Sequence, residues 1–110
     1  MRKQTEKLTL DELLALAGSE DPGNRVAAGI GLGERLKRSP ESREDTRVTA
    51  ALRTLINDRA HSRVRYRAAE ALHSAPELIP QFEAELRQLA ADDSNSSVRA
   101  VAQRRLKQLG

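Results

Sequence analysis

The sequence has no cysteine and no tryptophan, and it has only one tyrosine and one phenylalanine among its 110 residues. Without cysteine, the chain has no disulfide framework, no thiolate metal ligand and no cysteine nucleophile. No apolar run reaches the ~18 residues that a membrane span needs, and neither a signal-peptide pattern nor a lipidation motif is present. We therefore expect a cytoplasmic protein that does not interact with membranes.

Leucine and alanine supply most of the apolar side chains, with 15 leucines and 16 alanines. This composition suits closely packed helices, and the length suits a single domain. Lysine and arginine exceed the acidic residues by three, which gives a mildly basic chain. A small positive charge favours anionic partners without identifying one.

Helix signals follow one another along the whole chain, and no alternating strand pattern interrupts them. Thr9 and Glu12 form a capping box that starts the first helix, at about 9–17. The later helix starts are predicted at Asp21-Pro22, Ser39-Pro40, Ser62, Pro76 and the turn 92–96. The apolar stripes predict a core of Leu52, Leu55, Val64, Ala68, Leu72, Phe82, Leu86, Leu89, Val98, Ala102 and Leu106.

An internal repeat is the most informative feature of the sequence. Residues 50–72 match residues 84–106 at ten of 23 positions when the chain is shifted by 34 residues. Each repeat reads as a helix, a short turn and a second helix, and such a unit buries its apolar face only by stacking on a neighbour. We predict an all-α fold, a short α-solenoid of three antiparallel helix pairs at about 9–38, 40–75 and 77–110. Residues 1–8 are predicted to be a flexible N-terminal segment.

The repeated pattern resembles the HEAT and HEAT-like, bilin lyase-type, helical repeat family. The residues that carry this resemblance are Asp58, Val64, Arg65, Ala68 and Leu72, and their copies Asp92, Val98, Arg99, Ala102 and Leu106. The resemblance implies a structural ladder between turns and helices, formed by Asp58, Arg65, Asp92 and Arg99. It also implies that the second helix of each pair lines a concave surface.

No group of residues has the pattern of a catalytic, cofactor or metal site. The two histidines, His61 and His73, are 12 residues apart and have no cysteine or acidic cluster beside them. The serines near 96 lie in a turn, where helix capping accounts for them. We therefore predict that the protein is not an enzyme and has no catalytic residues, cofactor or metal.

Glycines recur in the second helix, in the run Gly29-Ile30-Gly31-Leu32-Gly33. Neither nucleotide-binding fingerprint fits this run, and no strand precedes it. A stripe of Val26, Gly29, Ile30 and Gly33 shares one helix face. This stripe either packs against another helix of the same domain or forms an interface with a partner or a second copy of the chain.

The second helix of each pair is basic, because residues 22–38, 59–75 and 94–110 carry charges of +3, +3 and +4. The candidate basic surface consists of Arg59, Arg63, Arg67, Arg104, Arg105 and Lys107. It is either a solvated face or a site for phosphates or acidic protein segments. Tyr66 is the only aromatic residue nearby, so few bases could stack on it.

Three functions are compatible with these patterns. The leading one is a non-enzymatic scaffold or adaptor that binds another protein. The second is a nucleic-acid-binding module that contacts the phosphate backbone through the basic second helices, and the third is a lyase-like enzyme. A second copy of the chain, bound through the second helix, is a further candidate partner.

Overall fold

The structure is a computed structural model that describes residues 8–109. Within this range the chain forms six α-helices and three 3₁₀ helices, and it contains no strand. The α-helices are α1 (Leu10–Ala17), α2 (Pro22–Arg38), α3 (Thr46–Ile56), α4 (Ser62–Ala71), α5 (Glu83–Asp92) and α6 (Ser96–Lys107). The 3₁₀ helices are η2 (Pro40–Glu44), η3 (Leu72–Ser74) and η4 (Pro76–Phe82). The prediction of an all-α fold is confirmed.

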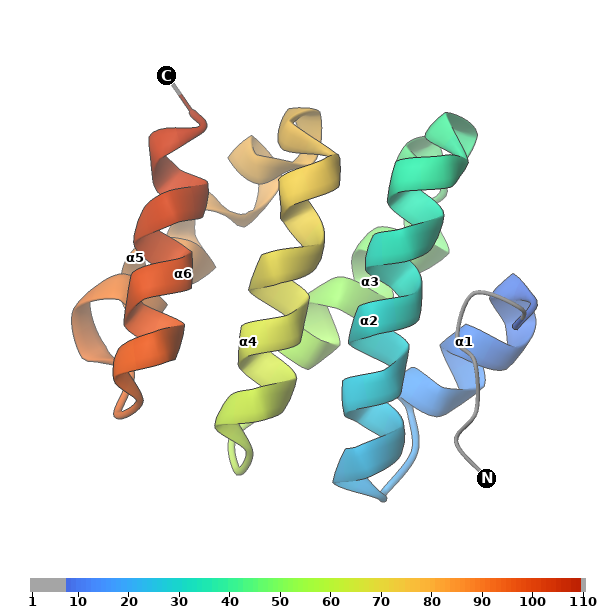
Figure 1. Ribbon diagram of the computed structural model, residues 1–110, viewed down its shortest axis with the longest axis horizontal. Helices are drawn as coiled ribbons and strands as arrows, with labels where there is room; N and C mark the ends of the chain where they lie inside the picture. Colours follow the sequence, from blue (N-terminus) through green and yellow to red (C-terminus); the bar gives the residue numbers. More distant parts are fainter. Residues whose placement is uncertain (1–7, 110) are drawn as a thin grey trace.

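The helices form three stacked pairs, in which α1 packs on α2, α3 on α4 and α5 on α6. Figure 1 shows α2, α4 and α6 side by side in one layer, running in the same direction, with α3 and α5 behind them. Within this layer α2 contacts α4, and α4 contacts α6. We call the outer surface of α2, α4 and α6 the second-helix face.

The first two helices start at their predicted caps. The Thr9 hydroxyl accepts a hydrogen bond from the Glu12 amide at 3.1 Å, and the Glu12 carboxylate accepts one from the Thr9 amide at 2.9 Å. At the start of α2, an Asp21 carboxylate oxygen accepts from the Gly23 amide at 2.8 Å. These bonds satisfy amides that have no partner inside the first helical turn.

The third helix starts later than the sequence predicts. The Ser39 hydroxyl donates to the Glu41 carboxylate at 2.7 Å instead of capping a helix, and residues 40–44 form η2. The Asp45 carboxylate then accepts from the Arg47 amide at 2.9 Å and starts α3. The prediction of one continuous helix from Pro40 is therefore wrong.

The starts of the fourth and fifth helices also differ from the prediction. Ser62 is the first residue of α4 rather than its cap, because His61 occupies the cap position. Pro76 begins η4, and Pro80 lies inside η4 without an amide to donate. The α-helical part of this segment therefore starts only at Glu83.

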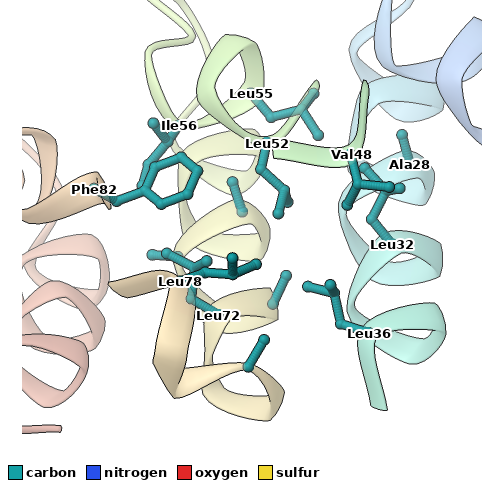
Figure 2. Packing of buried hydrophobic residues seen from close by; sticks show 14 of the residues in the cluster. Ala28, Leu32, Leu36, Val48, Leu52, Leu55, Ile56, Leu72, Leu78 and Phe82 are labelled. Atoms are coloured by element: carbon teal, nitrogen blue, oxygen red, sulfur yellow. The ribbon is translucent and has the colours of Figure 1, made fainter. Parts of the chain in front are cut away.

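One continuous core fills the space between the two layers of helices. Figure 2 shows Leu32 and Leu36 of α2 packing toward Leu52 of α3 and Leu72 of η3. Nine of the eleven predicted core residues are buried, whereas Leu89 and Leu106 are partly buried at its edge.

The predicted flexible segment 1–8 falls mostly outside the described residues, which exclude residues 1–7. Leu8 itself is buried in the core, and its carbonyl accepts a hydrogen bond from Arg35 Nη2 at 3.3 Å. Leu8 therefore does not belong to a flexible segment, because it is part of the packing of the first helix pair.

Candidate binding groove between α4 and α6

A groove of about 390 Å³ lies between α4 and α6 on the second-helix face. The residues that line it are Ser62, Arg63, Tyr66, Arg67, Asn95, Ser97, Ala100 and Arg104. Its volume falls within the range of small-ligand sites, roughly 300–1,000 Å³. The groove therefore has room for a few side chains of a ligand.

The charge of the groove is entirely positive. Three of its lining residues are arginines, Arg63, Arg67 and Arg104, and none is acidic. None of these three arginines pairs with a carboxylate of residues 8–109. Other arginines in the same range do lie within 4.0 Å of a carboxylate, among them Arg25, Arg43, Arg47, Arg53, Arg65, Arg87 and Arg105. Positive charges gathered in a hollow raise the local concentration of anions.

The helices determine where the three guanidinium groups lie. Arg63 and Arg67 are four residues apart on α4, so both side chains lie on the same side of that helix. The Arg67 guanidinium lies 5.7 Å from the centre of the Tyr66 ring, a cation–π distance that orients it. In the 34-residue repeat, Arg104 of α6 corresponds to Glu70 of α4. The three arginines therefore lie one after another along the helix axes, at different positions along the groove.

One end of the groove is formed by uncharged polar groups. The Asn95 side-chain oxygen caps α6 by accepting from the amides of Ser97 at 2.9 Å and Val98 at 3.2 Å. Its side-chain nitrogen donates to the Ser62 hydroxyl at 3.4 Å. Because α4 and α6 run in the same direction, the positive ends of both helix dipoles lie at this end. The groove as a whole therefore suits an anionic ligand.

Only part of the predicted basic surface lies in the groove. The structure brings Arg63, Arg67 and Arg104 together there, whereas Arg59 and Lys107 are exposed but do not line the groove.

The assignment of Arg105 to this surface is wrong, because only 6% of the residue is exposed. Its Nη1 lies 3.9 Å from the Glu70 carboxylate, and burial lowers its pKa although Glu70 opposes that effect. Adjacent helical residues point about 100° apart, so Arg104 and Arg105 lie on different sides of α6.

The glycine stripe packs α2 against α4. A Cβ atom placed on Gly29 would lie 2.9 Å from Arg67 Cβ, and one on Gly33 would lie 3.2 Å from both Cα and Cβ of Ala71. Val26 packs against the core, and Ile30 lines a smaller hollow of about 200 Å³ between the two helices. The predicted interface stripe is therefore corrected to a contact within the domain, and association with a second copy through α2 loses its main support.

Arginines of the second helices connect the turns of successive pairs. Arg25 of α2 donates to the Ser19 carbonyl, in the turn before its own helix, and to the Asp58 carboxylate in the next turn, at 3.0 and 2.7 Å. Arg65 of α4 repeats this arrangement with the Asp58 carbonyl at 2.9 Å and the Asp93 carboxylate at 2.6 Å. These contacts form a ladder along the stack.

Arg99 of α6 ends the ladder by donating to the Asp93 carbonyl at 2.6 Å. The assignment of Asp92 to the ladder is wrong, because α5 continues through Asp92 and leaves it exposed. Sequence reasoning also missed Arg25. The available signal was the match of Arg25 with Arg65 at an offset of 40 residues.

Burial raises the pKa of Asp93, but the hydrogen bonds from Arg65 and the Asn95 amide, with the charges of Arg65 and Arg99, outweigh it. The pKa of Asp93 therefore lies below its ordinary value. Burial likewise raises the pKa of Asp58, and the amides of His61 and Ala60 together with Arg25 lower it below the ordinary value. Both carboxylates are stabilised in their charged form.

Within residues 8–109, no three histidine, cysteine or acidic side chains are grouped in a way that could hold a metal ion. None of the helices in this part of the chain combines the length and apolar character required to cross a bilayer.

Stacked helix pairs joined by a repeated arginine ladder define an α-solenoid. A sequence profile of HEAT repeats matches residues 10–107. The chain therefore belongs to the HEAT repeat family. Searches of curated proteins and of solved structures gave no significant match.

Proposed function

We propose that the protein is a non-enzymatic scaffold or adaptor that binds another protein through the second-helix face. HEAT repeats commonly serve as scaffolds for protein interactions, which supports this function at the level of the family. The observation that carries the proposal for this chain is the groove between α4 and α6, where three arginines have no acidic partner among residues 8–109. Unpaired charges in a hollow are available to an external ligand.

Binding of nucleic acid through the same arginines is the alternative function. The positive charge of the second helices favours it. Two features of the second-helix face oppose it: Glu34 and Glu70 balance Lys37 and Arg67 in the neighbouring hollow between α2 and α4, and Tyr66 is the only aromatic side chain among the described residues that line the groove. A phosphate backbone that crossed the face would therefore pass from the positive groove to a hollow in which the charges balance.

The experiment compares proteins captured from a nuclease-treated lysate by the tagged parent and by two double variants. Arg63→Glu with Arg104→Glu reverses the charge of the groove. Arg47→Glu with Arg87→Glu is the matched control, because both side chains are more than half exposed on α3 and α5. We expect some proteins to be captured by the parent and by the control variant but not by the groove variant. The same captured proteins for all three chains would contradict the proposal.

A further inference from the structure

The three arginines of the groove, which no carboxylate of the described residues pairs with, are spaced along its length. With a rise of about 1.5 Å per residue, Arg63 and Arg67 lie about 6 Å apart along α4. Arg104 lies at the level of Glu70, about 4.5 Å further along, because the two residues correspond in the repeat. The positive charge is thus distributed over about 10 Å rather than concentrated at one point.

This spacing matches the geometry of an extended peptide. Side chains at alternate positions of an extended chain lie on the same side, about 6.6–6.8 Å apart. Carboxylates at positions i and i+2 of such a segment would therefore lie opposite Arg63 and Arg67, and one at i+4 would lie within reach of Arg104. Planar guanidinium groups bind carboxylates through paired hydrogen bonds.

The groove also limits the length of the ligand. A span of about 10 Å, lengthened by the reach of the terminal arginine side chains, corresponds to about four or five residues of extended chain. The Asn95 and Ser62 side chains form one end of the groove, where Asn95 Nδ2 and the two hydroxyls of Ser62 and Ser97 are available beside the charges. The positive charge does not continue beyond the groove, because Glu34 and Glu70 balance Lys37 and Arg67 in the hollow between α2 and α4. A short segment fits this site better than a long polyanion.

Building on the proposed function, we infer that the groove between α4 and α6 binds a short, extended acidic segment of a partner protein. Arg63, Arg67 and Arg104 bind its carboxylates. Tyr66 and Ala100 provide the apolar surface of the groove, and Asn95 and the two serines contact polar groups of the segment.

The direct test is an NMR titration of the isotope-labelled chain with a hexapeptide of alternating glutamate and serine. The control peptide has glutamine in place of glutamate. We expect saturable amide shifts confined to residues 62–67 and 95–104 with the acidic peptide, and none with the neutral one. Shifts centred on another part of the molecule, or no saturable shift, would overturn the inference.

The double variants identify the responsible charges. Reversal of Arg63 and Arg104 should weaken binding of the acidic peptide roughly tenfold or more, because two attractive contacts become repulsive. Reversal of Arg47 and Arg87 should change it less than about twofold, because these exposed side chains belong to α3 and α5 and do not line the groove. Equal effects of the two variants would show that binding depends on net charge and refute the site. Thermal unfolding of both variants checks that they are folded.

A duplex DNA competitor separates the two classes of ligand. We expect DNA not to displace the acidic peptide from the groove at about 200 mM salt. DNA that shifts the groove amides while the peptide leaves them unchanged would overturn the inference in favour of nucleic acid. Capture experiments distinguish the wider proposal: partners lost with the groove variant would uphold the scaffold function even if the acidic peptide did not bind.

Discussion

Arg65 Nε lies 2.6 Å from a carboxylate oxygen of Asp93, and this contact joins α4 to the turn before α6. Both side chains are largely buried, at 12% and 3% exposure. A second hydrogen bond, from Nη2 to the other carboxylate oxygen at 3.1 Å, makes the pair bidentate. The same arginine also donates to the Asp58 carbonyl, so one side chain joins two helix pairs.

Asp93→Asn should therefore destabilise the protein by about 3 kcal/mol, because it leaves the buried Arg65 without its counter-charge. Asp92→Asn is the matched control, since Asp92 is exposed, and it should change the free energy of unfolding by less than about 0.5 kcal/mol. Urea unfolding at pH 7 measures both values. A larger cost for Asp92→Asn than for Asp93→Asn would show that the ladder uses the other aspartate.

Stability should fall in acid because of the same ladder. The pKa values of Asp58 and Asp93 lie below their ordinary value in the folded state. The unfolded chain therefore binds more protons than the folded chain, and stability rises with pH in this range. The stabilisation that the two charged carboxylates contribute is complete above the ordinary aspartate pKa of about 3.9. It is lost as the pH falls through their lowered pKa values in the folded state.

Urea midpoints measured between about pH 7 and pH 3 test this expectation. The parent should lose stability as the pH falls below the ordinary aspartate pKa. The double variant Asp58→Asn with Asp93→Asn should lose less, because two of the carboxylates with lowered pKa values are removed. Glu41, Asp45 and Glu77 also have lowered pKa values, so part of the acid sensitivity should remain. Parallel curves for parent and variant would argue against a role for the ladder.

The helices and their pairing were predictable because their signals are local. The capping box at Thr9 and the cap at Asp21 depend on side chains two or three residues from their amides. The repeat could not predict that Asp93, rather than Asp92, belongs to the ladder. The choice between them depends on where α5 ends, and the 34-residue alignment places Asp58 on Asp92.

The candidate site was predictable only in part for a similar reason. The four-residue spacing of Arg63 and Arg67 places both on one side of α4 whatever the neighbouring helix does. Whether Arg104 or Arg105 lines the groove depends on the rotation of α6 about its axis against α4. Packing between the helices sets that rotation, and it places Arg105 inside and Arg104 in the groove.

Gly29→Ala should destabilise the protein although alanine favours helices. The added Cβ would lie 2.9 Å from Arg67 Cβ, so α2 and α4 must move apart. Overpacking of this kind costs about 1–3 kcal/mol, whereas the gain in helix propensity is about 1 kcal/mol, so a net loss is expected. Gly18→Ala is the control, because its nearest neighbour would be an ordinary 3.8 Å away. A melting temperature for Gly29→Ala at or above that of Gly18→Ala would contradict close packing.

Arg105→Met should leave stability unchanged or increase it. Arg105 is buried, its Nε has no hydrogen-bond partner within the described residues, and its nearest carboxylate, on Glu70, is 3.9 Å away. Burying a charged group without good hydrogen bonds is costly, and methionine fills a similar volume without that cost. The Glu70 side chain is 45% exposed, so water can solvate it after the substitution.

Arg65→Met provides the comparison, because it makes the same chemical change at an arginine whose three guanidinium nitrogens each donate a hydrogen bond. We expect Arg65→Met to lower the free energy of unfolding by about 3 kcal/mol. Arg105→Met should leave it unchanged or raise it, with any loss smaller than about 1 kcal/mol. Urea unfolding of the two variants beside the parent measures the difference. Equal losses would mean that Arg105, in spite of its incomplete hydrogen bonding, stabilises the stack as strongly as a ladder residue.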